Sequence, residues 1–194
     1  MLSERAATRP SRVHKSAKPA TTTMYFNIKP LALLAVTALA PLADALRYDG
    51  YSSTVACSGP SFFCNDGGGV CCSLPTGFGF SVQFADLPAG TQGQGYTGDT
   101  CSSFLFSVFG PGTRCWNGGG ARATHMNWFH SPQGSRRNLI ASRADNSTCG
   151  PSGFTYHDDS GVERSIKVPL GEAEAIVESY TKKDFAKLAS YETY

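Results

Sequence analysis

The sequence of 194 residues contains no apolar run long enough to cross a membrane. A membrane-spanning helix needs about 20 consecutive apolar residues. The most apolar segment, residues 31–40, is roughly half that length, and Pro41 and Asp44 follow it closely. This shortage excludes a hydrophobic anchor, and we predict no stable membrane span in the mature protein.

The same short run fits a secretory signal peptide. Lys29 precedes it, and the small-residue triplet Ala43-Asp44-Ala45 follows it, which is the order of a basic region, an apolar region and a cleavage site. We therefore predict cleavage after Ala45. Residues 1–45 would form an N-terminal extension plus signal peptide, and residues 46–194 a single secreted, disulfide-rich domain.

An excess of basic residues is also missing from the predicted mature part. The whole chain has a formal charge of +2, but residues 46–194 hold 11 basic and 13 acidic residues, a formal charge of −2. A nucleic-acid-binding domain is expected to be basic. We therefore predict no nucleic-acid partner.

The seven cysteines lack the spacings of metal and redox sites. Residues 57–72 read CSGPSFFCNDGGGVCC, with spacings C-x6-C-x6-C-C. Zinc sites pair ligands two to four residues apart, and a thioredoxin-like motif needs C-x-x-C. Cysteines of an exported chain are expected to form disulfides. We predict a disulfide framework, no metal site and no cofactor.

The adjacent pair Cys71 and Cys72 is predicted to bond in two directions, because neighbouring side chains of an extended segment point to opposite faces. One of the pair would bond locally and the other to a later cysteine; the open partners are Cys57 or Cys64, and Cys101, Cys115 or Cys149. Seven is an odd number, and we expect Cys149 to be the free or late-paired thiol.

Apolar alternation and frequent glycine and proline predict a mainly β fold, a small antiparallel sandwich or barrel. Residues 78–84 alternate as a half-buried strand. Residues 104–109 are apolar on both faces, which favours an interior strand. Residues 154–168 read as a hairpin with its turn at 158–161. Short α-helices are predicted after Pro169.

The C-terminal tail changes to a helical period over residues 171–191. Its phase breaks at Lys182-Lys183, and Asp184 is suited to cap a second short helix. We expect this tail to pack on the sheet. A partner-binding helix is the alternative.

The cysteine-bearing region resembles the small secreted cysteine-rich proteins of filamentous fungi over about residues 57–120. The likeness rests on four stretches, CSGPSFFCNDGGGVCC, SVQFADLP, GQGYTGDTC and GPGTRCWNGGG. Proteins of this type are secreted, and some act as effectors or elicitors on plant hosts. The resemblance thus implies an effector-like role and no particular reaction.

Common catalytic motifs are missing as well: the sequence has no G-x-S-x-G, HExxH or phosphate-binding loop. The densest polar cluster, His157-Asp158-Asp159, lies on the predicted hairpin turn. A secreted hydrolase of unrecognised type remains an alternative to a binding protein. The sequon at Asn146 is a predicted glycosylation site.

The segment CWNGGGARATHMNWFH, residues 115–130, is the best binding surface in the sequence. Tryptophan beside amide and guanidinium groups suits sugar stacking or a protein contact; the predicted binding residues are Trp116, Asn117, Arg122, His125 and Trp128. The alternative is that both tryptophans fill the core. The expected partner is an extracellular protein or a cell-wall polysaccharide, which makes a carbohydrate-binding module the second functional hypothesis.

Overall fold

The computed structural model describes residues 45–130 and 145–194. The predicted signal peptide and N-terminal extension lie outside the described residues, except for Ala45. The first strand begins at Leu46, the residue that follows the predicted cleavage site. Among the described residues, no helix is long and apolar enough to span a membrane.

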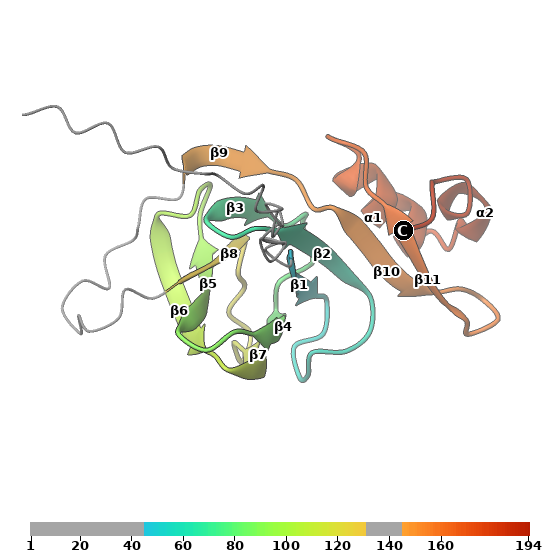
Figure 1. Cartoon of the computed structure of the whole chain (residues 1–194). Helices are drawn as coiled ribbons and strands as arrows, with labels where there is room; N and C mark the ends of the chain where they lie inside the picture. Colours follow the sequence, from blue (N-terminus) through green and yellow to red (C-terminus); the bar gives the residue numbers. More distant parts are fainter. Residues whose placement is uncertain (1–44, 131–144) are drawn as a thin grey trace, which may run out of the picture. The chain divides into compact units, whose positions relative to one another are not determined.

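The described residues form eleven strands and two helices (Figure 1). In chain order these are β1 (Leu46–Tyr51), β2 (Ser61–Asp66), β3 (Val70–Ser73), β4 (Ser81–Leu87), β5 (Thr91–Thr97), β6 (Ser103–Phe109), β7 (Gly112–Asn117), β8 (His125–His130), β9 (Asp145–Cys149), β10 (Gly153–His157), β11 (Glu163–Lys167), α1 (Ala173–Thr181) and α2 (Phe185–Leu188).

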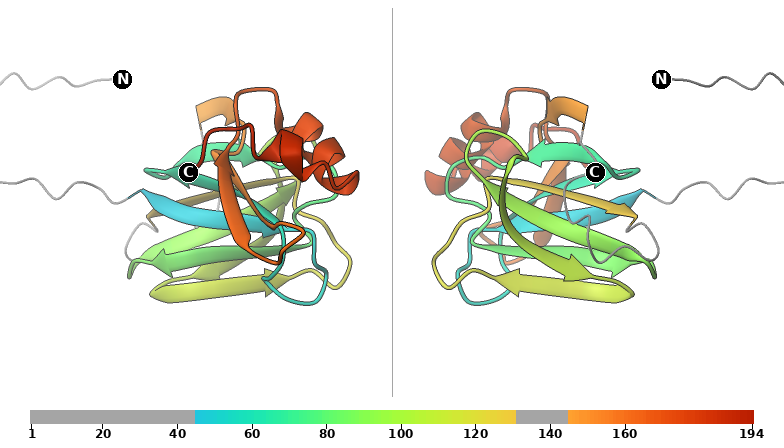
Figure 2. Two further views of the ribbon diagram at one scale, coloured as in Figure 1. Left: turned by 90° about the vertical axis from the view of Figure 1, so that its right-hand side faces the viewer. Right: turned by 90° about the vertical axis from the view of Figure 1, so that its left-hand side faces the viewer.

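The strands build two sheets, which Figure 2 shows from two sides. Sheet A has the order β11-β10-β2-β1-β4-β7, and sheet B the order β6-β5-β8-β3-β9. The strand pairs are antiparallel except β3 with β9, which is parallel. The prediction of a mainly β, antiparallel, disulfide-stabilised domain is confirmed.

The apolar core lies between the sheets and is rich in aromatic rings. Tyr48 of β1 stacks on Phe84 of β4 with ring centroids 5.6 Å apart. Two glycines of β5 make room for such rings: a Cβ on Gly93 would come within 2.5 Å of Phe84, and a Cβ on Gly95 within 2.0 Å of Phe106. Gly93 therefore makes room for a ring of the opposite sheet, and Gly95 for the ring of its register partner on β6.

The predicted hairpin and helical tail are present. The β10–β11 turn is held by the Asp158 carboxylate, which accepts hydrogen bonds from the backbone N–H groups of Ser160 and Val162. Ile176 of α1 and Leu188 of α2 are buried in the core cluster. As predicted, the Asp184 side chain caps α2 by accepting from the Lys187 N–H, and the tail packs on the sheet.

Two expectations about strands are wrong. The strand expected from residue 78 begins at Ser81, because Gly79 adopts φ +93° and turns the chain. Phe78 instead packs edge-on against Phe62 at 4.7 Å. The strand expected in a sheet interior, β6, is the edge of sheet B, and its Phe104 and Phe109 are exposed.

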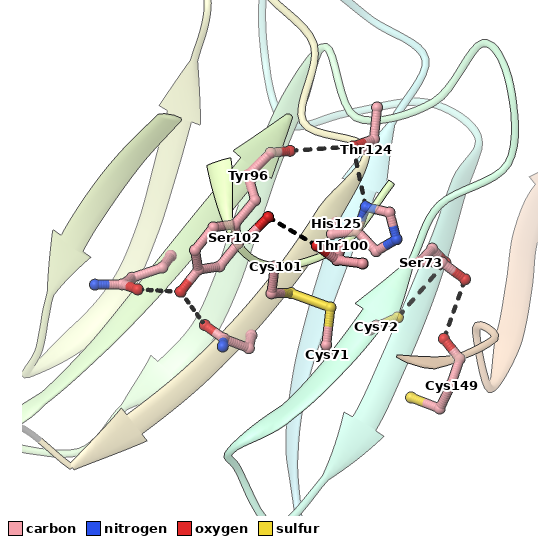
Figure 3. The surroundings of a disulfide bond; sticks show 12 residues. Cys71, Cys72, Ser73, Tyr96, Thr100, Cys101, Ser102, Thr124, His125 and Cys149 are labelled. Carbon is pink, nitrogen blue, oxygen red and sulfur yellow. Dashed lines mark hydrogen bonds between the residues drawn. A yellow bond between two sulfur atoms is a disulfide. The ribbon is translucent and has the colours of Figure 1, made fainter. Parts of the chain in front are cut away.

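The disulfides follow the two-direction prediction for the adjacent cysteines. Cys72 bonds locally to Cys64, and Cys71 bonds to the later Cys101, as Figure 3 shows for the second bond. The third bond joins Cys57 to Cys115. Cys149 is the free cysteine, as expected.

Candidate functional site

The two tryptophans of the predicted binding surface lie on different sheets. Trp116 of β7 is half-buried, and its ring stacks on Phe106 of β6 with centroids 3.9 Å apart and planes 7° apart. Trp128 of β8 is 4% exposed, and its indole Nε1 donates to the Asp66 carbonyl at 3.2 Å. Both rings are packed into the fold, in agreement with the alternative reading as core residues.

Asn117 and Arg122 contact the backbone of neighbouring loops. The Asn117 amide donates to the Val55 carbonyl at 2.8 Å and accepts from the Gly119 N–H at 3.0 Å. The Arg122 guanidinium donates to the carbonyls of Phe78 and Pro75, each at 2.7 Å. Asn117 therefore ties the β1–β2 connection to the turn after β7, and Arg122 holds the connection between β3 and β4.

His125 is buried at 6% exposed, and its Nδ1 lies 3.0 Å from the Thr124 hydroxyl. Burial lowers the pKa of its imidazole from the ordinary value. The structure thus does not bring the five predicted residues together on one open surface. Their role in binding stays a prediction, and each already has contacts within the fold.

Two further sequence-based candidates lie outside the predicted binding surface. The sequon residue Asn146 belongs to β9, but its side chain lies outside the described residues, so glycosylation stays a prediction. In the His157-Asp158-Asp159 cluster, Asp158 is committed to the turn and to Arg164 Nε at 2.9 Å. Hydrogen bonds from Ser160 and Arg164 hold the pKa of this carboxyl well below its usual range.

An open groove lies beside the C-terminal hairpin, in the region where Figure 2 shows the helices next to β10 and β11. It has a volume of about 680 Å³. The lining comes from the hairpin, from α2 and from the last residues: Tyr156, Asp158, Asp159, Glu163, Arg164, Ser165, Ile166, Phe185, Ala189, Tyr191, Thr193 and Tyr194. We call this the C-terminal groove.

Four aromatic side chains contribute to the lining of the C-terminal groove. Tyr156 is 2% exposed and stacks on Phe185 with planes 6° apart. Tyr191 is half-buried, whereas Tyr194 is 53% exposed and packs edge-on against Phe63 at 4.8 Å. The groove lining therefore combines a stacked aromatic pair with one accessible ring.

The backbone fixes the position of this accessible ring. The Tyr194 N–H donates to the Ser165 carbonyl at 3.0 Å, and the Lys167 N–H donates to the Glu192 carbonyl at 2.7 Å. An antiparallel bridge joins Ile166 to Thr193. The end of the chain thus lies along the edge of β11 and presents Tyr194 beside the hairpin.

Carboxylates also line the groove. Asp159 and Glu163 are exposed, and within the described residues neither makes a side-chain hydrogen bond or ion pair. Asp158 is paired with Arg164, so these two charges offset each other. The groove therefore has a net negative character and two carboxylates available to a ligand.

A polar network on the outer face of sheet A reaches the groove. The Arg47 guanidinium pairs with the Asp49 carboxylate at 2.6 Å and donates to the Thr155 hydroxyl at 3.1 Å. Thr155 is hydrogen-bonded to Ser165, which lines the groove, at 2.9 Å. Arg47 also lies 3.9 Å from the centroid of the Phe63 ring. This network fixes the sheet surface next to Tyr194.

A smaller depression of about 370 Å³ lies near the start of α1. Its carboxylate, Glu174, already accepts hydrogen bonds from the backbone N–H and the hydroxyl of Thr76, at 2.9 and 3.2 Å. Prolines contribute much of the remaining lining: Pro75, Pro151 and Pro169. The C-terminal groove is the better candidate site because two of its carboxylates, Asp159 and Glu163, are open to a ligand.

The sheets and the three bonds together define a small disulfide-bonded β domain. The chain belongs to the family described as ARB_05566_N, N-terminal domain, which matches residues 48–158. Neither a curated protein nor a solved structure matches the chain. The match ends in the turn after β10, so most of the groove lining comes from residues beyond it.

The sequence pattern did not single out Tyr191 and Tyr194. The expectation that the tail packs on the sheet explains its buried residues, but it gives no reason for a ring left exposed at the end of the chain. The available signal was the aromatic content of the tail, with Tyr180, Phe185, Tyr191 and Tyr194 in its last fifteen residues.

Proposed function

We propose that this chain is an extracellular, effector-like protein that acts by binding, and that the C-terminal groove is its binding site. The observation that carries the proposal is the exposed ring of Tyr194 beside the open carboxylates of Glu163 and Asp159. The groove volume of about 680 Å³ falls within the usual range of ligand sites.

The extracellular part of the proposal is supported by the cysteine chemistry. Three disulfides in a domain of this size are typical of an oxidising compartment. The predicted cleavage site lies directly before Leu46, where β1 begins. The effector-like part rests on the resemblance of residues 57–120 to small secreted cysteine-rich fungal proteins.

A carbohydrate of the cell wall is the second candidate ligand, and the side chains of the groove favour it. Aromatic rings offer a flat apolar face for the C–H groups of a sugar ring. Exposed carboxylates accept hydrogen bonds from sugar hydroxyls, and hydrogen bonds to charged groups are the stronger kind. Tyr194 and Glu163 supply one group of each type within one groove.

The carbohydrate hypothesis is tested with the secreted protein on insoluble chitin, cellulose and β-glucan. We expect the amount bound at a given protein concentration to fall about tenfold in Tyr194→Ala and in Glu163→Gln, because a loss of about 1.4 kcal/mol corresponds to a factor of ten in affinity. Val55→Ala is the matched control, since Val55 is 80% exposed and lies outside the groove. Its binding should equal that of the wild type.

If the wild type binds none of these polymers, a wall carbohydrate is not the ligand. The effector role is then tested by infiltrating the protein into leaves of several plants. A host response that Tyr194→Ala weakens and Val55→Ala leaves intact supports the proposal. Equal responses to all three proteins would remove the groove from it, and inert protein in every host would contradict the effector role.

A further inference from the structure

Three cysteines lie on strands β2, β3 and β9, and a disulfide joins only two of them. Cys64 of β2 bonds to Cys72 of β3, and this bond joins sheet A to sheet B. Cys149, at the end of β9, is the register partner of Cys72 in the parallel β3–β9 pair. The free thiol therefore lies on the strand directly beside a disulfide-bonded cysteine.

The side chains of Cys72 and Cys149 belong to the same face of sheet B. Register partners of paired strands project to one side, and neighbouring strands lie about 4.8 Å apart. Cys72 is fully buried in the core, and Cys149 packs against the same core cluster. The strand spacing lies within the range of Cα separations, about 4.4 to 6.8 Å, that a disulfide spans.

A hydrogen bond fixes the end of β9 in this register. The Ser73 hydroxyl donates to the Cys149 carbonyl at 3.1 Å, and Figure 3 shows this contact next to Cys72. On the core side, burial and the nearby Asp66 carboxylate raise the pKa of the Cys149 thiol, and Tyr48 is close enough to interact with it. The thiolate is thus a minor form at neutral pH.

We propose that Cys149 exchanges with the Cys64–Cys72 disulfide, so that the folded chain has two interchangeable arrangements of one interior bond. The Cys149 thiolate attacks Sγ of Cys72, the Cys72–Cys149 bond forms, and Cys64 leaves as a thiolate. One disulfide breaks and one forms, and the proton lost by Cys149 is balanced by the proton that Cys64 takes up. No outside oxidant or reductant is needed.

The exchange changes what the bond holds together. In the first arrangement it joins the two sheets, and in the second it ties the edge strand β9 to β3 within sheet B. The second bond also closes a much longer loop of the unfolded chain, which in the chain-entropy model adds stability. The free thiol moves from half-buried Cys149 to Cys64, which is 1% exposed.

The location of the free thiol tests the exchange. The wild-type protein is held at mildly alkaline pH, quenched with acid, unfolded and labelled with N-ethylmaleimide; the bonded cysteines are then reduced and given a second label. We expect the first label on both Cys149 and Cys64 by mass spectrometry. In Cys149→Ser the first label on Cys64 should disappear.

A second variant tests whether the sulfurs of Cys72 and Cys149 are close enough to form a bond. Cys64→Ser, oxidised with glutathione disulfide, should form a Cys72–Cys149 bond. First label confined to Cys149 in the wild type overturns the proposal, and so does a folded Cys64→Ser that keeps both thiols. If Cys64→Ser does not fold, the wild-type labelling decides alone. Label on Cys64 that persists in Cys149→Ser also contradicts the exchange.

Discussion

At the scale of single residues, the outer face of sheet A shows how a charged group is kept within a β surface. Asp49 is 4% exposed, yet its carboxylate receives hydrogen bonds from the Arg47 guanidinium and from the Ser61 hydroxyl at 3.0 Å. A buried charge is tolerated only with such partners. The Asp49 charge also affects the phenol of Tyr51, which lies two residues further along β1.

Tyr51 gives a prediction about alkaline pH. Burial, with the Asp49 charge as a second cause, raises the pKa of its phenol to about 12. The unfolded chain loses this proton near about pH 10. The contribution of Tyr51 to stability is therefore complete below about pH 10 and is lost as the pH rises toward about 12. We expect the free energy of unfolding to fall less steeply across this window in Tyr51→Phe.

The measurement is urea unfolding at several pH values, with both proteins carrying Cys149→Ser to prevent thiol exchange. Below about pH 9 the Tyr51→Phe variant should lose only about 1 kcal/mol, for its hydrogen bond to Gln83. Some alkaline loss remains in the variant because burial also raises the pKa of Tyr48. Parallel pH curves for the two proteins would show that Tyr51 titrates normally.

At the scale of secondary structure, the sequence predicted helix ends best, because neighbouring residues decide where a helix begins and ends. The break at Lys182-Lys183 and the Asp184 cap were predicted from the sequence and are present. The edge position of β6 was not predictable, because an apolar pattern on both faces also suits a central strand. Whether Phe104 and Phe109 are exposed depends on which strands pair with β6, and strand pairing is a long-range property.

The end of α1 offers a test of local backbone strain. Lys183 adopts φ +58°, and two hydrogen bonds close the helix end: Lys183 N–H to the Tyr180 carbonyl and Asp184 N–H to the Ser179 carbonyl. This is the Schellman arrangement, whose left-handed position glycine usually occupies. Lys183→Gly should raise the free energy of unfolding by about 0.5 kcal/mol, since relief of the strain exceeds the entropy cost of glycine.

Urea unfolding measures this difference, and Lys183→Ala is the control. Alanine keeps the strained left-handed backbone and removes only the lysine side chain, so its stability should match the wild type within a few tenths of a kcal/mol. Equal gains in the two variants would mean that the lysine side chain, and not the backbone, is responsible.

At the scale of the whole molecule, apolar alternation predicted the fold class and the cysteine pattern predicted a disulfide framework, but neither predicted the candidate site. The adjacency of Cys71 and Cys72 was enough to predict two bond directions, because alternation along a strand is a local rule. The C-terminal groove forms only when the tail docks on the edge of β11 and places Tyr194 near Glu163. No local pattern encodes that meeting of distant segments.

The tryptophans were uninformative for a similar reason, because their packing partners come from distant parts of the sequence. A tryptophan in a β domain suits either a core or a binding surface, and only the stacking partner distinguishes the two. Trp116 of sheet A stacks on Phe106 of sheet B, with the ring planes 7° apart. The exposed aromatic side chain of the C-terminal groove is instead Tyr194.

The disulfide framework gives the last prediction, because its three bonds close loops of very different length. Cys57–Cys115 spans 58 residues and Cys64–Cys72 spans 8. In the chain-entropy model the longer loop contributes about 4 kcal/mol and the shorter about 2.5 kcal/mol.

Cys57 is half-buried and Cys115 exposed, so serines there add little desolvation cost. The double variant Cys57→Ser/Cys115→Ser should therefore lose about 4 kcal/mol in urea unfolding. Cys149→Ser, which removes no bond of the framework, is the matched control, and its loss should be well below that of the double variant. A double variant as stable as this control would mean that the bond between the β1–β2 connection and β7 only follows a fold already fixed by the sheets.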